Sequence, residues 1–458
     1  MPITAETPPH PRPSKRLTIL DLVGQACAIG PLIGIGLFLA FVAQIAGGRG
    51  PLAILLAAIG MVCFAMVIAF YASFTGGAGA MGDYVERAWG RRAGMAILII
   101  YTFSLLVSGA GGFSIAVGVL VANFSKAYLF GLVPWWGGAL IVVLIAWIMN
   151  VRGADVATRA QLVIVLVSVI PFLLTAVAAI IHAGPANTWD FFSIFHVTGG
   201  GNLFGGLLFA ILLFGGFETV AVLAEEASNP RRTIPLALVS TVVLTGILFV
   251  LCSYAGTVYF GPELVGKAWP AQLDGFAEMA NRLLGHWAGM WIRVGIFADF
   301  ISCFIGFSLA ASRGLYALSR AGILPPVLAR TNRLGAPTMA SHCVLATALV
   351  AIAIGFLIPD HERYKSLFVV ATAQGLLLAL TYAVLAVGAC KIILASGKSS
   401  LPRWVVLVIA SAMPILALYG SLFPFPQGPE QWGVWGAFAA ILLAIIGSLV
   451  WKPGASRP

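Results

Sequence analysis

Long apolar runs separated by short polar stretches are the dominant pattern of this chain. A helix that crosses the roughly 30 Å hydrocarbon layer of a bilayer needs about 20 mainly apolar residues. The apolar residues are continuous within each run and do not alternate with polar ones, which excludes the strands of a membrane β-barrel. Runs bounded by charges, glycine and proline predict twelve membrane-spanning helices, at residues 19–46, 51–75, 93–122, 136–151, 160–182, 203–227, 235–260, 289–312, 341–358, 366–394, 403–423 and 433–451.

The composition agrees with this pattern. Of the 458 residues, 60% are hydrophobic and 9% are charged, whereas an average soluble protein is about 45–50% apolar and about 25% charged. A soluble globular protein is thereby excluded, and the chain is predicted to be an all-α integral membrane protein. Two loop segments are predicted to form short helices. The segment 79–90 mixes aromatic and charged residues and is expected to be an amphipathic or re-entrant helix, and the segment 272–285 has apolar residues at helical spacing. The second is expected to lie in the membrane interface, and ordinary loop packing is the alternative for both.

The basic residues are distributed unevenly between the two sides of the predicted spans. Nineteen of the 26 Lys and Arg residues lie in alternate loops and in both tails, and such loops are usually cytoplasmic. The pattern predicts a protein of the cytoplasmic membrane with both termini inside. It also explains the net charge of +10 without a nucleic-acid partner, since the basic residues face the lipid bilayer surface.

Two predicted spans contain backbone breaks near their middle. The first has Gly30, Pro31, Gly34 and Gly36 in sequence, and the sixth has Gly215 followed by Gly216. Proline lacks an N–H group and glycine weakens a helix, so both spans are expected to open. Irregular backbone at this depth is tolerated where it is buried in protein or lines a cavity, as in a substrate site. Close packing of glycine-rich helices is the alternative.

The two breaks lie five spans apart, which is an odd number. The first five helices and the next five would then have opposite orientations in the membrane, as in transporters built from inverted repeats. The sequence therefore predicts a 5+5 inverted repeat with discontinuous helices 1 and 6, plus two extra C-terminal helices. The expected organisation is a disordered cytoplasmic tail at 1–18, a transporter core at 19–394, helices 11 and 12 at 395–452, and a cytoplasmic tail at 453–458.

Three stretches resemble motifs of the amino acid–polyamine–organocation (APC) permeases, which have the leucine-transporter-like fold. Residues 30–38, GPLIGIGLF, are similar to the first-helix motif G-x-x-x-G-x-G-I-F. Residues 214–218, FGGFE, and 224–235, AEEASNPRRTIP, are similar to F-x-G-F-(D/E) and A-E-E-x-x-N-P-x-R-x-I-P. Residues 312–325 resemble the segment after helix eight, although Ala321 stands where the family usually has an acidic residue.

The resemblance implies a substrate site formed by the backbone of the two broken helices. The carboxylate of an amino acid would meet N–H groups near Ile35 and Gly36, and its ammonium group would meet carbonyls near Ile29, Phe214 and Gly215. A zwitterion needs donors and acceptors a few ångströms apart, and opposed helix ends supply both. The predicted substrate-binding residues are Ile29, Gly30, Ile33, Gly34, Ile35, Gly36, Phe214, Gly215, Gly216 and Phe217.

Two acidic residues lie deep within predicted spans, Glu218 and Asp299. A charge at that depth is costly, so each is a candidate for proton coupling or gating, with packing as the alternative. Ser302 lies three residues after Asp299 on the same helix face and is a further candidate. Many proton-coupled relatives carry a lysine in helix five, where this chain has Ser168. A lysine-centred mechanism is therefore not expected; a proton is the expected coupling ion, and sodium is less favoured.

The remaining chemistry of the sequence does not favour an enzyme. The six histidines lie at the edges of spans and in loops, the six cysteines lie in apolar runs without paired spacing, and no phosphate-binding or nucleophile motif occurs. No cofactor and no metal are expected. The predicted function is a secondary transporter that moves amino acids or related amines by alternating access. A polyamine or organic-amine antiporter or facilitator is the alternative, and a channel or a membrane solute receptor is the alternative of a different class.

Overall fold

The computed structural model describes most of the chain. The described residues are 19, 22–23, 34–75, 81–152, 157–195, 200–218, 229–272, 274–333, 335–360, 362–363, 365–397 and 400–451. These residues form helices joined by turns and loops, and no β-strand occurs among them. The predicted all-α class is confirmed.

The helices follow the predicted apolar runs. In the first half they are the π-helix η1 (Gly34–Phe38), α3 (Leu39–Ala46), η2 (Gly47–Arg49), α4 (Gly50–Thr75), α5 (Met81–Trp89), α6 (Arg91–Phe103), the π-helix η3 (Ser104–Gly112), α7 (Phe113–Tyr128), α8 (Trp135–Arg152), α9 (Ala157–Ala183), η5 (Gly184–Ala186) and η6 (Asp190–Phe192). In the second half they are α10 (Leu203–Phe214), α11 (Pro230–Phe260), α12 (Val265–Ala268), α13 (Gly275–Leu284), α14 (His286–Arg320), η8 (Pro326–Ala329), α15 (Thr338–Gly355), α16 (Lys365–Ser396), α17 (Leu401–Leu422) and α18 (Glu430–Val450).

Nine helical runs in the described part of the chain are long and apolar enough to cross a membrane. One of them, Gly34–Ala72, contains two of the predicted spans, with a short turn of helix at Gly47–Arg49 between them. Two further apolar helices, Trp135–Val151 and Leu203–Phe214, are shorter. The class of multi-pass membrane protein is confirmed, whereas the count of twelve spans stays a prediction.

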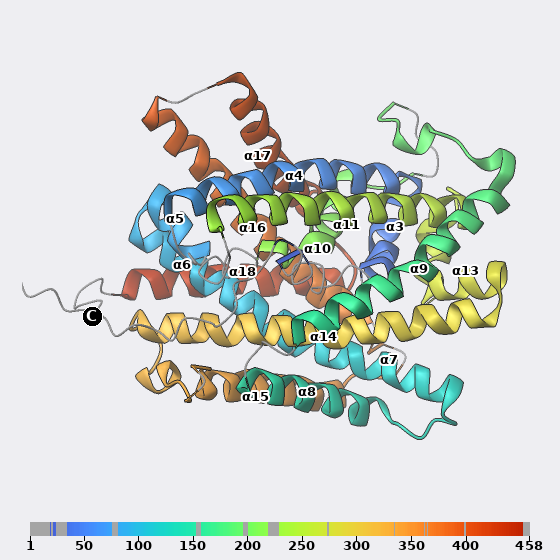
Figure 1. The fold of residues 1–458 in the computed structure, drawn as a ribbon, viewed down its shortest axis with the longest axis horizontal. Helices are drawn as coiled ribbons and strands as arrows, with labels where there is room; N and C mark the ends of the chain where they lie inside the picture. The colour runs from blue at the N-terminus through green and yellow to red at the C-terminus, as the bar shows by residue number, and fades with distance from the viewer. Residues whose placement is uncertain are drawn as a thin grey trace, which may run out of the picture.

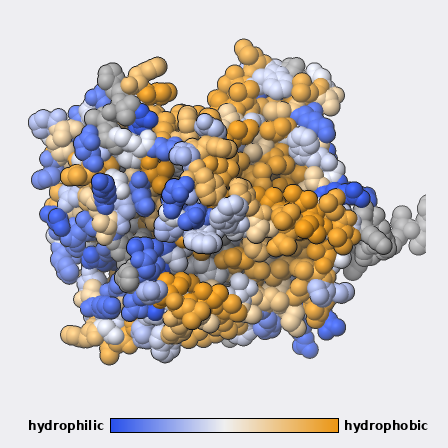
Figure 2. Space-filling model, turned by 180° about the vertical axis from the view of Figure 1, so that it is seen from behind, coloured by the Kyte–Doolittle hydropathy of each residue, from blue (hydrophilic) through white to orange (hydrophobic). Residues whose placement is uncertain are grey.

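Most of the long helices run roughly along the longest axis of the molecule (Figure 1). Their outer faces carry apolar side chains such as Ile141, Val177, Ile247 and Leu442, each more than two-fifths exposed. Figure 2 shows this apolar surface as a broad orange area, with hydrophilic residues gathered mainly toward one end. An exposed apolar surface of this extent is what a surrounding bilayer covers.

Two of the described helices, α10 and α14, lie at the centre of the packing. The short helix α10 packs against α3, α4, α16 and α17, while the long helix α14 packs against α8, α9, α13 and η3. Buried aromatic side chains join these elements; for example, the Phe368 ring of α16 stacks on Phe209 of α10 at a centroid distance of 5.0 Å. The sixth and eighth predicted spans, which correspond to α10 and α14, are therefore packed inside the bundle.

Both predicted loop helices are present. On α5, the Trp89 Nε1 group donates to the Val384 carbonyl of α16 at 3.1 Å, so this helix is fixed to the tenth predicted span. On α13, the apolar face packs on α9, where Phe276 and Phe172 stack at 5.5 Å. Leu273, which belongs to the predicted pattern, lies outside the described residues. The position of α13 in the membrane interface stays a prediction.

The segment that connects α11 to α14 contains two helices, α12 and α13, which pack against different parts of the molecule. The short helix α12 lies against α3, where a Cβ atom added at Gly266 would be 3.0 Å from the Ala43 carbonyl oxygen. By contrast, α13 packs against α14 and α9, and its Asn281 side chain contacts Gly289 of α14 closely. One connection thus spans from the first predicted helix to the eighth.

Candidate functional site

The predicted break in the sixth span is confirmed. Helix α10 ends at Phe214, and the next residue, Gly215, has extended ψ and donates its N–H to the Leu212 carbonyl at 3.0 Å. Gly216 has φ of 105°, in the left-handed region that a residue with a Cβ rarely adopts. The glycine pair therefore turns the chain out of the helix, which leaves the last carbonyls of α10 without helical partners.

The first break itself falls outside the described residues, and so do Ile29, Gly30 and Ile33. The described helix resumes at Gly34 as the π-helix η1, in which Gly34, Ile35 and Gly36 are all buried. A π-helical turn inserts extra residues into a helix and is found frequently at functional sites. The structure therefore places an irregular turn next to the predicted break.

The structure brings the two predicted break regions together. A Cβ added at Gly34 would lie 2.9 Å from Leu213 Cδ2 of α10, and one added at Gly36 would lie 2.5 Å from Ile296 Cδ1 of α14. Both glycines are thus needed for close approach, because any larger residue would displace these side chains. The ring of Phe214 packs edge-on against Phe249 of α11 at 5.2 Å. Phe217 is also buried, so both aromatic residues of the motif face protein.

Glu218 lies just after the break with its carboxyl group inside the protein. The side chain is 3% exposed. Its Oε2 accepts a hydrogen bond from the Gly216 N–H at 2.9 Å, and its Oε1 accepts one from the Tyr101 hydroxyl of α6 at 3.0 Å. Among the described residues, Glu218 forms no ion pair. The carboxyl group is therefore held by neutral donors alone.

Tyr382 of α16 completes the surroundings of Glu218. Its side chain is fully buried, interacts electrostatically with Glu218 and Tyr101, and lies tilted against the ring of Phe64 of α4 at a centroid distance of 4.2 Å. Its hydroxyl group faces the Glu218 carboxyl group. We call Tyr101, Glu218 and Tyr382 the core carboxyl cluster. It joins the third, sixth and tenth predicted spans at the level of the break.

Asp299 and Ser302 are both buried in α14, as predicted. Asp299 lies three residues after Ile296, the side chain that contacts Gly36, and so shares its helix face. Ser168 of α9 is buried against Gly295, where an added Cβ would lie 2.9 Å from the Ser168 Cβ atom. The structure therefore brings Ser168 beside the turn of α14 that precedes Asp299. Whether these residues handle an ion stays a prediction.

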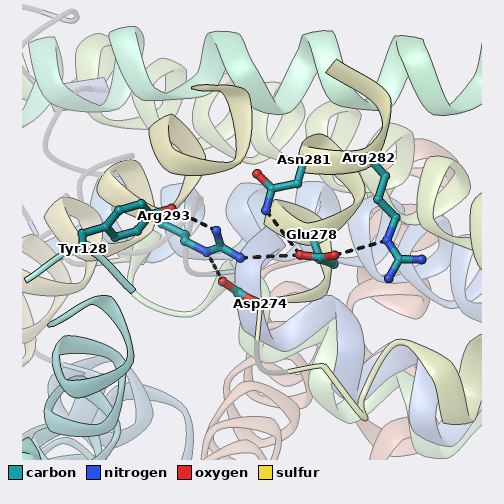
Figure 3. Close-up of polar contacts among 6 residues, drawn as sticks. All are labelled: Tyr128, Asp274, Glu278, Asn281, Arg282 and Arg293. Carbon is teal, nitrogen blue, oxygen red and sulfur yellow. Dashed lines mark hydrogen bonds and ion pairs between the residues drawn. The ribbon is translucent and has the colours of Figure 1, made fainter. Parts of the chain in front are cut away.

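A second group of charged residues lies between α13, α14 and the end of α7 (Figure 3). The Arg293 guanidinium pairs with Asp274 through Nε and with Glu278 through Nη2 at 3.7 Å, and its Nη1 donates to the Tyr128 hydroxyl at 3.1 Å. Glu278 also accepts from Asn281 and Arg282. We call these six residues the outer ion-pair cluster.

The surroundings of Glu278 shift the pKa of its carboxyl group. Partial burial raises the pKa of its carboxyl group, but hydrogen bonds from Asn281 and Arg282 and the charges of Arg282 and Arg293 lower it, and the net direction is down. The cations thus favour the ionised carboxylate. This cluster behaves as a set of ion pairs that fastens α13 to α14 and α7.

The sequence did not identify Tyr382 as a neighbour of Glu218, and it did not show that the six residues of the outer ion-pair cluster lie together. The Tyr101 hydroxyl donates directly to Glu218. Tyr382 is 281 positions further along the chain than Tyr101, and no local pattern connects them. The only available signal was a tyrosine within an apolar run.

The chain matches the family model described as "Amino acid permease" over residues 22–449. It is 26% identical over 311 residues to the branched-chain amino acid permease BcaP of Lactococcus lactis subsp. cremoris, covering 65% of this chain and 63% of that protein. It is 28% identical over 406 residues to the gamma-aminobutyric acid permease of Escherichia coli, covering 84% and 81%. A probable polyamine transporter of Arabidopsis thaliana is 25% identical over 207 residues, covering 45% and 40%.

Among solved structures, the fold is similar to the crystal structure of a manganese transporter from Eremococcus coleocola. The TM-score is 0.54 at 13% identity, and the match covers 94% of each chain. This likeness concerns the fold and agrees with the predicted leucine-transporter-like class. The family match spans both predicted breaks and the core carboxyl cluster. The chain belongs to the amino acid permease family.

Proposed function

We propose that this protein is a secondary transporter that moves amino acids or related amines across the cytoplasmic membrane, with both termini in the cytoplasm. The observation that carries the proposal is the break in α10 at Gly215 and Gly216, packed beside Gly34 of the first predicted helix. Membership of the permease family supports the same function. The names of the relatives support amino acids and polyamines as substrate classes.

The substrate would be bound mainly by the helix ends. The C-terminal end of α10, near Phe214, has the negative end of its helix dipole and the last carbonyls of the helix, which attract an ammonium group. The N–H groups near Ile35 and Gly36, which follow the predicted break in the first span, would attract a carboxylate. Because Gly34 and Leu213 lie close to each other, these two segments are near enough to hold one small zwitterion. Ile29, Gly30, Ile33, Ile35 and Phe217 remain predicted members of this site.

We assign proton coupling or gating to Glu218. A buried acid with neutral donors is the type of group that gains and loses a proton during transport. Protonation would weaken the charge-assisted bonds from Gly216 and Tyr101, and so loosen the link between the sixth and third predicted spans. Asp299, with Ser302 and Ser168 near it, is the second candidate. Alternating access would then rock the first, second, sixth and seventh helices against the third, fourth, eighth and ninth.

A ligand screen followed by a transport assay tests the proposal. The purified protein in detergent is heated with leucine, γ-aminobutyrate, spermidine or glutamate, and stabilisation by a ligand grows as RT ln(1 + [L]/Kd), about 2.7 kcal/mol at a hundredfold excess over Kd. A stabilising compound is then used for counterflow in proteoliposomes. Saturable exchange supports a carrier, non-saturable flux indicates a channel, and binding without flux indicates a receptor. No stabilisation by any amino acid or amine would remove the proposed substrate class.

A further inference from the structure

A buried side-chain amide oxygen in α16 has no hydrogen-bond donor among the described residues. Gln374 is 3% exposed, and its Oε1 atom accepts no hydrogen bond from the described residues. Glutamine is rarely buried to this degree, and a buried acceptor without a donor costs free energy. The residue was not selected from the sequence, because it lies alone in an apolar run. Its Oε1 atom is therefore an acceptor for which the described residues supply no donor.

The helix register places Gln374 on the side of α16 that faces the break. One turn later, Leu378 is the side chain closest to where a Cβ of Gly215 would be, at 3.1 Å. One turn earlier, Val370 is the side chain in close contact with Gly112 at the end of the π-helix η3. Residues four apart lie along one helix stripe. Gln374 therefore lies on the stripe between the broken sixth helix and the irregular part of the third.

The same stripe continues to the core carboxyl cluster. Tyr382 lies two turns beyond Gln374, and the intervening residue Leu378 contacts the break. Irregular backbone occurs on both sides of this stripe, at Gly215 and Gly216 on one and in η3 on the other. Polar side chains directed toward such irregular segments are typical of substrate sites in membrane proteins.

A small cavity elsewhere in the protein is also lined by polar groups that lack hydrogen bonds. Trp147 Nε1 and Ser308 Oγ have no hydrogen-bond partner within the described part of the chain, and both line this cavity, which lies between α8, α14 and α15. That cavity offers about 10 Å³ to the centre of a water molecule, which is roughly the space that one water needs. Gln374 does not line this cavity. Ser308 therefore serves as a matched unpartnered group remote from the break.

We propose that Gln374 contacts the substrate, with its amide oxygen accepting a hydrogen bond from an N–H group of the bound amino acid or amine. This inference rests on the proposed function. An amide oxygen is a neutral acceptor, so it accepts from a neutral or a cationic substrate alike. A carboxylate at that position would instead require the amide to turn and donate from Nε2.

The test compares ligands that differ in N–H donors at constant charge. Affinities of the full chain are measured for leucine, γ-aminobutyrate and spermidine, and for the N-trimethylated forms of the first two, in wild type, Gln374→Met and Gln374→Glu. Trimethylation keeps the charge but removes every N–H donor. In wild type, trimethylation should weaken binding strongly. In Gln374→Met, the ratio of the Kd of the trimethylated compound to the Kd of its parent should be about tenfold smaller, which corresponds to the loss of a hydrogen bond to a charged group. Gln374→Glu should raise affinity for spermidine relative to leucine.

Ser308→Ala is the control, because it removes an unpartnered group remote from the break and should leave every affinity unchanged. If Gln374→Met keeps the wild-type trimethylation penalty, the inference is wrong while the transport proposal stands. If Gln374→Met does not fold, an unchanged spermidine-to-leucine ratio in Gln374→Glu overturns the inference equally. If wild type binds none of the three amines, the proposed function fails first and the inference with it.

Discussion

The core carboxyl cluster and the outer ion-pair cluster hold their acids in opposite ways. Glu218 is almost fully buried and is bound by an N–H group and a tyrosine hydroxyl, without a cation among the described residues. Asp274 and Glu278 are about one-quarter to one-third exposed and share the guanidinium of Arg293. An acid held by neutral donors can change its protonation with modest rearrangement, whereas an acid paired with arginine stays ionised. The first arrangement suits transport and the second suits fastening.

The largest expected effect concerns Glu218. The change Glu218→Gln keeps the shape and removes the charge, so transport should fall at least about tenfold, equivalent to about 1.4 kcal/mol, and lose its dependence on pH. Binding of a stabilising ligand should persist. Uptake by proteoliposomes across pH 5 to 8 measures the effect, with Glu278→Gln as the control that keeps the wild-type profile. An unchanged pH profile in Glu218→Gln would remove this residue as the proton carrier.

The next effect concerns Arg293. The change Arg293→Met leaves Asp274 and Glu278 without their shared cation, and should destabilise the protein by about 2 kcal/mol, less than for a fully buried pair. Thermal unfolding in detergent measures the loss. Arg282→Met is the matched control: Arg282 pairs with the same Glu278 but its side chain is 63% exposed, so its removal should lower the melting temperature much less than Arg293→Met does. Equal losses would mean that Arg293 is not the central member of the cluster.

A smaller effect separates the two tyrosine hydroxyls. Tyr101→Phe removes the donor to Glu218, and Tyr128→Phe removes the partner of Arg293. Each should lower the free energy of unfolding by about 1 kcal/mol, the typical contribution of one hydrogen bond. Only Tyr101→Phe should also change the pH dependence of transport. A transport defect of the same kind in Tyr128→Phe would contradict the division between the two clusters.

The smallest effect is the acid sensitivity that comes from Glu278. Because the folded protein lowers the pKa of this carboxyl below its ordinary value of 4.5, its ionised form stabilises the fold at neutral pH. That stabilisation is present above pH 4.5 and is lost as the pH falls through the folded-state pKa. Wild type should therefore lose slightly more melting temperature between pH 6 and pH 3.5 than Glu278→Gln. An identical loss in both proteins would show that the ion pairs add nothing measurable.

Much of the fold followed from the sequence, because twenty-residue apolar runs leave few other structures open to the chain. The break at Gly215 was predictable for the same local reason, since two adjacent glycines within a span interrupt a helix. The helices of the two loops were predicted from local features: α5 from its mixture of aromatic and charged residues, and α13 from apolar residues at helical spacing. These features depend on neighbours in the sequence.

The composition of the clusters was not predictable in this way. Glu218 was evident as a charge within a span, but its partners Tyr101 and Tyr382 come from helices more than a hundred residues away in each direction. Gln374 was missed because its position beside the break follows from the contact between Leu378 and Gly215, which the sequence does not show. The π-helix η3 was also missed, although its residues Ser104–Gly112 include three glycines, because glycines alone do not distinguish a π-helical turn from close helix packing. Such features depend on tertiary packing.

The connection between α11 and α14 has a mechanical consequence. Its first part, α12, rests on α3, and its second part, α13, is tied to α14 through Arg293 and through Asn281 against Gly289. The short stretch from Trp269 to Asp274 joins them, and Trp269 is wedged against Gly256 and Gly275. If the first and eighth predicted helices separate at this end of the molecule, that stretch must lengthen or release its tryptophan. The six residues therefore limit how far the two helices can move apart.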